Sequence, residues 1–391
     1  MEHTWRWFGP TDPITLAEIR QTGATGVVTA LHEIDNDTTW PAAAIDQRKT
    51  AVEAAGLVWS VVESIPLTEA IRTGGPGRDA DIDAWATTLR RLGAAGVTTV
   101  CYNFMPVADW TRTELARPLA TGGTALAFDY IACAAFDLFL LQRPGAAEDY
   151  DAAERAAAEA CLASLDAAAR QRLIDNVTAG LPGADAGYDL AGFRAAIAAY
   201  RGIGHAGLRE NLRYFLERVA PVAEAAGVRL AIHPDDPPRS LFGLPRIVSN
   251  AADARWILDA VDSRASGLTF CTGSYGAAAD NDLAAMAAEF APRIHFAHLR
   301  SVARDRVEPR SFAEAGHLAG DADIVGVMAE LLAEEDRRSV AGGAPLPMRA
   351  DHGHHLLGDG ARDTRAGYPL YGRLKGLAEL RGLEAGLRCR C

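Results

Sequence analysis

Eight short apolar segments recur along this chain of 391 residues, and helical patterns separate most of them. The helical segments carry apolar residues three or four positions apart, which is typical of amphipathic helices. Several end in glycine, the common stop of a helix, as at Gly56, Gly96 and Gly227. Alternating strands and helices predict a parallel sheet, and eight such units predict an α/β fold, the closed (β/α)8 TIM barrel. The expected strands are residues 4–9, 25–34, 57–64, 97–104, 228–235, 267–274, 293–300 and 347–353.

One connection is much longer than the others. Residues 108–210, between the fourth and fifth expected strands, carry helical patterns and a charged alanine-rich stretch. Long connections in compact domains are usually functional. No flexible linker marks a domain boundary, so we expect a single TIM-barrel domain over residues 1–391, with residues 108–210 as a helical insertion that could form a lid.

Four of the expected strands end in a residue type that binds transition metals. His233, Cys271, His298 and Asp351 close the fifth, sixth, seventh and eighth strands. The carboxyl ends of barrel strands face one rim, where barrel enzymes hold their active sites. Two imidazoles, a thiolate and a carboxylate suit Mn(II), Fe(II), Co(II) or Zn(II) better than Mg(II) or Ca(II). The pattern therefore predicts a metal site.

Each of these residues also has a structural interpretation. A single strand-end histidine is more often a hydrogen-bonded structural group, a single cysteine in an apolar strand is usually a core residue, and Asp351 could cap a helix. Such residues are unlikely to stand at four successive strand ends by chance, and this favours the metal site. His295 lies three residues before His298 and should face the other way, so we interpret it as structural.

Other strand-end residues are candidates for substrate binding. Arg300 lies two residues after His298, and Arg349 lies two before Asp351. Because side chains alternate along a strand, each arginine shares a strand face with that candidate ligand, where it could bind a carboxylate through two hydrogen bonds. A salt bridge within the barrel or at its rim is the alternative. Asn103 and Glu33 could hold hydroxyl groups.

Three further groups lie close to expected strand ends. Glu63 ends the third strand, but packing behind the site is its better interpretation. His352 and Tyr368 flank the end of the last strand and are candidate acid–base groups. Asp235 and Asp236, in "HPDDPP", favour a turn and contacts to the ligands rather than ligation itself.

Composition excludes several classes of function. The net charge of −12 argues against nucleic acids and anionic membranes as partners. No secretory signal or apolar span is visible and the six cysteines are scattered, so the cytoplasm is the expected compartment. The chain has only two lysines, Lys49 and Lys375, in helical stretches, which argues against a Schiff-base enzyme.

Longer motifs give the chain a resemblance to a known family. At "HPDDPP", "LFGLPRIV", "FCTGSYG", "HFAHLRS" and "MRADHGHHLL", and also at "TWRWFGPTDP", "CYNFMPVADWTRT" and "GYPLYGRLKGLAELRG", the chain resembles the mannonate dehydratase family of hexuronate breakdown. The likeness covers essentially the whole chain. It departs at Ala350, where the family usually has proline. Glu33 stands at a position that varies between histidine and glutamate in the family.

The resemblance implies a lyase with a TIM barrel and a divalent metal, usually Mn(II) or Fe(II). The implied reaction is dehydration of the small sugar acid D-mannonate to 2-keto-3-deoxy-D-gluconate. The family's metal ligands fall on His233, Cys271, His298 and Asp351 of this sequence. Its acid–base groups fall on His352 and Tyr368.

Three alternatives stay open at this stage. The chain could dehydrate another aldonate such as D-gluconate. It could be a metal-dependent sugar isomerase on the same fold, although such isomerases favour carboxylate-rich sites and often a lysine. It could also bind carbohydrate without turnover, against which the intact ligand set argues. Barrels of this type often pair, so we expect a homo-oligomer, dimer or higher.

Overall fold

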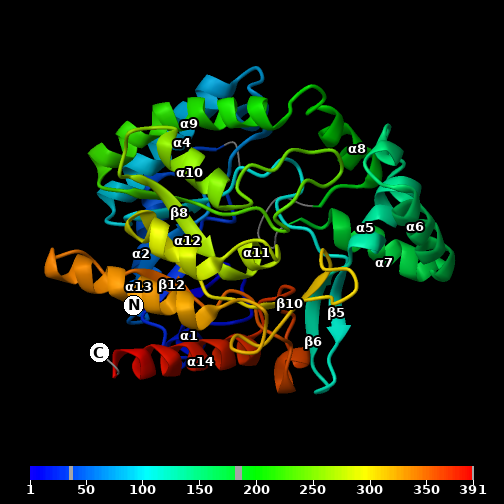
Figure 1. Cartoon of the computed structure of the whole chain (residues 1–391). Coiled ribbons are helices and arrows are strands. Elements are labelled where there is room, and N and C mark those ends of the chain that lie inside the picture. The colour runs from blue at the N-terminus through cyan, green and yellow to red at the C-terminus, as the bar shows by residue number, and fades with distance from the viewer. Residues whose placement is uncertain (35–37, 181–186, 390–391) are drawn as a thin grey trace.

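The computed structural model describes residues 1–34, 38–180 and 187–389 (Figure 1). Eight parallel strands close into a barrel in the order β1-β12-β9-β8-β7-β4-β3-β2. The α/β TIM barrel is therefore confirmed, with one strand in each expected segment. These strands are β1 (Glu2–Arg6), β2 (Gly26–Thr29), β3 (Val58–Glu63), β4 (Thr99–Tyr102), β7 (Arg229–Ile232), β8 (Ser266–Cys271), β9 (Ile294–His298) and β12 (Pro347–Arg349).

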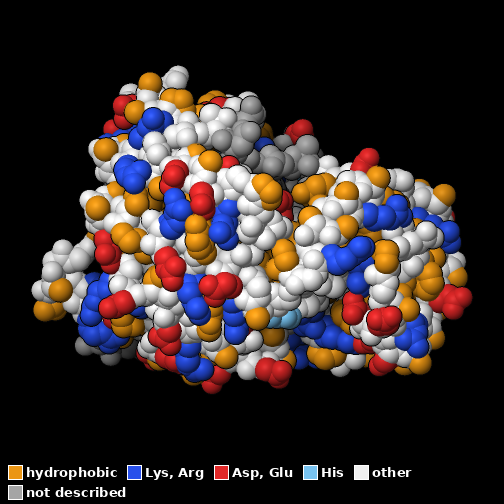
Figure 2. All heavy atoms as spheres, turned by 90° about the horizontal axis from the view of Figure 1, so that it is seen from above, with side chains coloured by type: hydrophobic (Ala, Val, Ile, Leu, Met, Phe, Trp, Pro, Cys, Tyr) orange, Lys and Arg blue, Asp and Glu red, His pale blue; other side chains and the backbone are white. Residues whose placement is uncertain are grey.

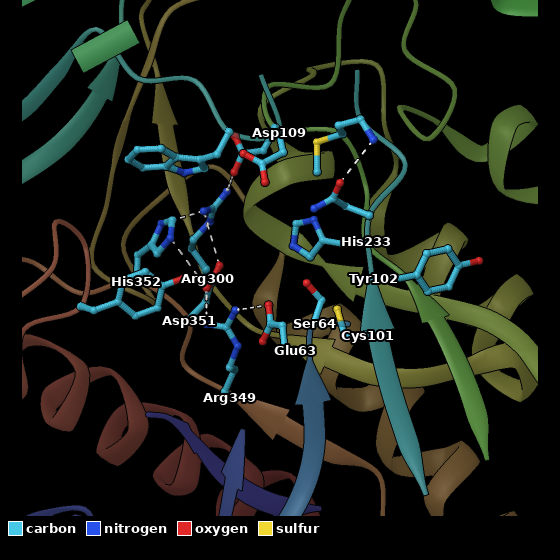
Figure 3. A pocket seen from close by; sticks show the side chains of 15 residues that line it. Glu63, Ser64, Cys101, Tyr102, Asp109, His233, Arg300, Arg349, Asp351 and His352 are labelled. Carbon is cyan, nitrogen blue, oxygen red and sulfur yellow. Dashed lines mark hydrogen bonds and ion pairs between the residues drawn. The ribbon is translucent and has the colours of Figure 1, made fainter. Parts of the chain in front are cut away.

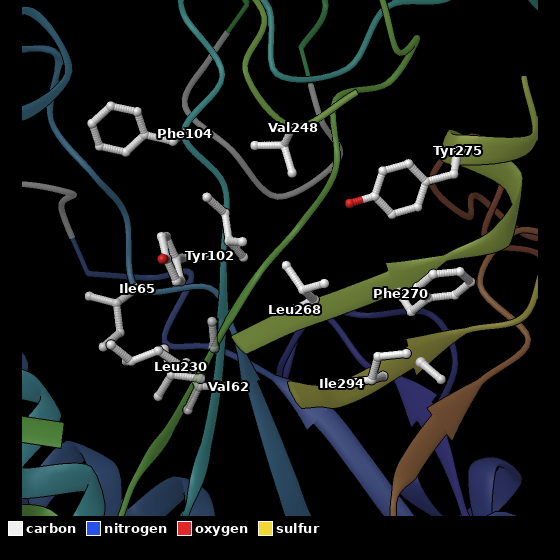
Figure 4. Close-up of a cluster of buried hydrophobic side chains, with 14 of the residues drawn as sticks. Val62, Ile65, Tyr102, Phe104, Leu230, Val248, Leu268, Phe270, Tyr275 and Ile294 are labelled. Atoms are coloured by element: carbon white, nitrogen blue, oxygen red, sulfur yellow. The ribbon is translucent and has the colours of Figure 1, made fainter. Parts of the chain in front are cut away.

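Alternation along the strands divides the buried side chains into two groups, because successive residues face opposite sides of a sheet. One cluster joins Val28, Val61, Cys101, Ala231 and Phe296, one residue from each of five strands, and fills the barrel. Their neighbours along the strands belong to the main core between barrel and helices, which Figure 4 shows around Val62, Leu230, Leu268, Phe270 and Ile294.

Amphipathic helices cover the barrel. The longest of the described helices, α9 (His205–Ala226), buries Leu208, Leu212, Phe215 and Val219. Its C-cap is Gly227, whose φ of +66° suits glycine best. The other surrounding helices are α1 (Leu16–Gln21), α2 (Ala42–Ala54), α3 (Glu69–Thr73), α4 (Arg78–Ala94), α10 (Ala251–Asp259), α11 (Thr272–Gly276), α12 (Leu283–Phe290), α13 (Ile324–Val340) and α14 (Leu370–Arg388).

The long connection after β4 lies beside the barrel, at the right of Figure 1. It contains α5 (Tyr130–Ala135), the π-helix η1 (Phe136–Leu141), α6 (Ala152–Ser164), α7 (Ala167–Thr178) and α8 (Leu190–Ala198). It also contains two strands, β5 (Glu114–Pro118) and β6 (Thr124–Phe128), so it is not purely helical. Residues 205–210 of the expected insertion belong to α9, which packs against α4 and leads into β7.

A second sheet, which the sequence did not predict, joins this connection to the loops after β9. It has the order β10-β11-β6-β5, with β10 (Val302–Arg304) and β11 (Phe312–Glu314) antiparallel. Strands of three residues are too short to show a period, and β5 is mostly exposed and lacks an apolar face. We call it the accessory sheet.

Two observations bear on the molecule's surroundings. Within the described ranges, no helix is long and apolar enough to cross a membrane. Positive and negative side chains are interspersed over the face seen in Figure 2.

Candidate metal centre and pocket

The barrel brings three of the four predicted metal ligands together. Cys271 and His298 are register partners at the ends of β8 and β9, and His233 directly follows β7. One ligand atom from each of the three lies within 4.8 Å of the others. Asp351 stands just outside this cluster, with Oδ2 3.8 Å from Cys271 Sγ and 4.0 Å from His298 Nδ1.

Hydrogen bonds fix how the two imidazoles face the cluster. His233 Nδ1 lies 2.7 Å from the Pro234 carbonyl, and His233 Nε2 lies 3.2 Å from His298 Nδ1. Arg349 Nε donates to His298 Nε2 at 3.1 Å. Since a guanidinium can only donate, this arrangement leaves the proton of His298 on Nδ1, between the two histidines.

The two imidazoles have the protonation state that a metal centre needs, whereas the Cys271 thiol would have to give up its proton to a bound ion. Burial lowers the pKa of His233 and, together with Arg349, that of His298, so both imidazoles are neutral, as ligands must be. Burial raises the pKa of the Cys271 thiol to about 12, and Ser274 Oγ donates to its sulfur at 3.2 Å. Two imidazoles, a sulfur and a nearby carboxylate therefore fit a borderline-soft divalent ion.

Asp351 is held in an uncommon backbone conformation. Its φ is +59°, in the left-handed region that few non-glycine residues adopt, and such residues concentrate at functional sites. Its carboxylate bonds to Arg349 and lies 3.4 Å from Arg300. Burial alone would raise the pKa of Asp351, but these two arginines and His352 hold it well below its usual range. The side chain is therefore an ionised carboxylate.

A small pocket opens beside this cluster (Figure 3). Arg300, Arg349, Asn103, His352 and Tyr368, all predicted from the sequence, line it. Glu33 does not: it pairs with Arg48 at 2.6 Å and its side chain is 55% exposed. The full lining is Glu63, Ser64, Cys101, Tyr102, Asn103, Met105, Asp109, Trp110, His233, Asp236, Arg300, Arg349, Asp351, His352 and Tyr368.

The two predicted acid–base groups stand side by side. The rings of His352 and Tyr368 meet edge to face at 5.1 Å, and Trp110 packs on His352 at 6.0 Å. Burial raises the pKa of the Tyr368 phenol to about 12, so it carries its proton at neutral pH. His352 Nδ1 lies 2.7 Å from an Arg300 nitrogen and 3.0 Å from a Glu314 oxygen.

Both predicted substrate arginines are already engaged with protein groups. Arg349 donates to Glu63 at 2.9 Å as well as to His298. Arg300 donates to Asp236 at 2.7 Å, and its guanidinium packs so close to Gly273 that a Cβ there would meet Arg300 Nε at 2.0 Å. The glycine of "FCTGS" therefore makes room for Arg300.

Sequence reasoning missed two buried charged residues that lie against the pocket. Arg112 and Glu314 are buried against the pocket residues, but Arg112 follows no barrel strand directly and Glu314 ends a strand of the accessory sheet. Strand-end position, the signal that found the other residues, could not find them. Asp236 and Glu63 were interpreted as supporting residues, and Glu63 does pair with Arg349 and with Arg6 at 3.2 Å.

Fold and pocket together define a class, the TIM-barrel enzymes whose active site lies at the carboxyl ends of the strands, here with a candidate metal centre. Residues 1–390 match the family D-mannonate dehydratase (UxuA). The chain belongs to the D-mannonate dehydratase family.

Individual relatives agree with this assignment. The chain is 63% identical to mannonate dehydratase of Chromohalobacter salexigens and 52% identical to that of a Marinomonas species, over 99% of each pair of chains. The crystal structure of mannonate dehydratase from Streptococcus suis serotype 2 superposes with a TM-score of 0.79 at 35% identity, covering 100% of this chain and 96% of that one. An E. coli 3-keto-D-glucoside 4-epimerase, with 13% identity and a TM-score of 0.51 over 98% and 99% of the chains, shares the fold alone.

Proposed function

We propose that this chain is a hydro-lyase that converts D-mannonate into 2-keto-3-deoxy-D-gluconate and water. The observation that carries the proposal is the match to the D-mannonate dehydratase family over residues 1–390. The pocket supports it, because metal-type donors and two acid–base groups line one cavity. In the reaction, C2 loses a proton, the C3 hydroxyl leaves as water, and the resulting enol takes a proton at C3 as it becomes the ketone.

We propose His233, Cys271, His298 and Asp351 as the ligands of a divalent ion, Mn(II) or Fe(II). The first three ligand groups already converge, and Asp351 Oδ2 lies within 4.0 Å of two of them. An ion bound there would supply a Lewis acid for the substrate carboxylate and the neighbouring hydroxyl.

We assign the proton transfers to His352 and Tyr368. Hydroxide is a poor leaving group, so the C3 oxygen needs a proton as it departs. The Tyr368 phenol, whose pKa burial raises to about 12, carries a proton that it can donate. His352 then is the group that accepts the C2 proton, through the ring nitrogen opposite Nδ1.

Substrate binding falls to the remaining pocket groups. Arg300 and Arg349 present positive charge to the pocket and would attract the substrate carboxylate, and Asn103 would hold a hydroxyl group. We assign no substrate contact to Glu33, because it pairs with Arg48 away from the lining.

We also propose that the protein works in the cytoplasm as a homo-oligomer. Each of the five described cysteines is free, which suits a reducing compartment. Light scattering on the purified protein tests the oligomeric state.

The function is tested by incubating the purified protein with D-mannonate, with chelator and then with added Mn(II). We expect a keto-deoxy acid to form in one-to-one ratio with substrate lost, to cease with chelator and to return with Mn(II). D-gluconate serves as the epimeric control and should react far more slowly. Absence of the keto-deoxy acid with Mn(II) present, or equal rates on both acids, would overturn the proposal.

A further inference from the structure

Four buried charged side chains form a closed ring against one wall of the pocket. Arg112 pairs with Asp236 at 2.8 Å, Asp236 with Arg300 at 2.7 Å, Arg300 with Glu314 at 3.4 Å and Glu314 with Arg112 at 3.0 Å. All four are at most 4% exposed. They come from the loops after β4, β7 and β9 and from β11, so the ring joins the accessory sheet to the barrel.

His352 contacts two members of this ring through its Nδ1 atom. Glu314 Oε1 lies 3.0 Å from that nitrogen and the Arg300 guanidinium 2.7 Å from it. Although burial alone would raise the pKa of Glu314, Arg300 and His352 hold it at about 2, so Glu314 is a carboxylate that only accepts. A guanidinium only donates, so Nδ1 can satisfy one of the two partners at a time.

The backbone around Glu314 reinforces its position. β11 pairs with β10 on one side and β6 on the other, and the Glu314 carbonyl lies 2.9 Å from His354 Nε2. Glu314 is thus fixed in a three-stranded setting while its side chain reaches the pocket wall. With Nδ1 on Glu314, the opposite nitrogen Nε2 stands 3.8 Å from Asp351 at the pocket.

We propose that Glu314 is a positioning residue: its carboxylate accepts the Nδ1–H of His352 and so aims Nε2 at the substrate. The accessory sheet is then part of the catalytic apparatus, because it delivers the group that orients His352. The inference rests on the dehydratase function and on the role of His352 within it.

The competing explanation is that Glu314 only balances the charge of the two buried arginines. Asp236 distinguishes the two, because it balances the same arginines in the same ring and its partners there are the arginines, not His352. Glu314→Gln keeps the shape and one accepting oxygen, and Glu314→Ala removes the acceptor. Asp236→Asn changes the charge balance of the ring and leaves the Glu314–His352 contact in place.

We expect Glu314→Ala to lower kcat on D-mannonate at least 100-fold, with KM and the Mn(II) dissociation constant within threefold of the unsubstituted protein. Glu314→Gln should recover about a tenth of the original kcat, and Asp236→Asn should lose kcat less than tenfold. Mn(II) titration and thermal unfolding of each variant report whether the fold survives, and Glu314→Gln keeps the test open if Glu314→Ala does not fold.

Two results would overturn the proposal. One is a kcat for Glu314→Ala or Glu314→Gln within threefold of the original. The other is a loss of kcat in Asp236→Asn as large as that in Glu314→Ala, because Glu314 would then only balance the charge of the arginines. Failure of the dehydratase function would be visible separately, as absence of turnover in the unsubstituted protein loaded with Mn(II).

Discussion

The two ends of β8 and β9 carry polar residues that are used in opposite ways. At the amino end, His295 Nε2 lies 3.1 Å from the Arg264 carbonyl and Arg293 donates to the Ser266 carbonyl at 2.9 Å. At the carboxyl end, Cys271 and His298 face each other and His233 rather than the backbone. The side chains at the amino end bond to main-chain carbonyls, and those at the carboxyl end bond to other side chains.

This difference shows why residue type alone does not identify a site. His295 and His298 share one strand, and both are buried. The His295 ring bonds to a main-chain carbonyl and has a role in stability. Both ring nitrogens of His298 instead contact side chains, those of His233 and Arg349, within the cluster proposed to hold a metal ion. Substitutions at matched positions on the two ends can test the distinction.

The largest effect is expected from His298→Gln compared with His295→Gln. The first variant should lose Mn(II) binding and about 10³-fold or more in kcat/KM, because metal stabilisation of the transition state is worth several kcal/mol. The second keeps a group that can bond to the Arg264 carbonyl, so its kcat/KM should stay within about twofold and its stability within about 1 kcal/mol. Equal activity losses in the two variants would remove the contrast.

Arg349→Met compared with Arg293→Met should give the next largest effect, on stability. Arg349 compensates Glu63 and Asp351, both buried, and removing one partner of such a group costs about 3–5 kcal/mol. Arg293 bonds to carbonyls of Ser263 and Ser266, so its loss should cost about 1–3 kcal/mol. Thermal unfolding of both variants measures the difference, and a reversed order would contradict it.

Metal removal should act on the carboxyl end alone. A ligand at 100 times its dissociation constant stabilises the folded state by about 2.7 kcal/mol. Chelation should therefore lower the melting temperature of the unsubstituted protein and of His295→Gln by the same amount. His298→Gln should not respond, and a full response in that variant would place the ion elsewhere.

The smallest effect is expected on metal affinity, from substitutions at the two ends of β8. Cys271→Ser should weaken Mn(II) or Fe(II) binding at least about tenfold, because a hydroxyl is a poorer ligand than a thiolate for such ions. Ser266, at the other end, has a buried hydroxyl with no hydrogen-bond partner among the described residues, so Ser266→Ala should leave affinity unchanged and stability within about 1 kcal/mol. Calorimetric metal titration measures both, and unchanged affinity in Cys271→Ser would remove the sulfur from the site.

The sequence by itself determined the barrel and the positions of the proposed metal ligands. Short apolar runs and amphipathic helices reflect local burial, which leaves a period in the sequence, and the parallel barrel then places every strand's carboxyl end at one rim. His233, Cys271 and His298 could be found this way because each closes a strand. The family motifs around them carried the expected reaction.

Only the tertiary structure decided what surrounds those residues. Glu314 and Arg112 lie 202 positions apart in the sequence and meet through a sheet whose strands are too short to leave a period. Glu33 follows a barrel strand and yet turns to Arg48, because pairing with a neighbouring charge is a matter of three-dimensional contact. Periodicity records which side of an element is buried, but long-range ion pairs depend on which elements meet, and no local pattern encodes that.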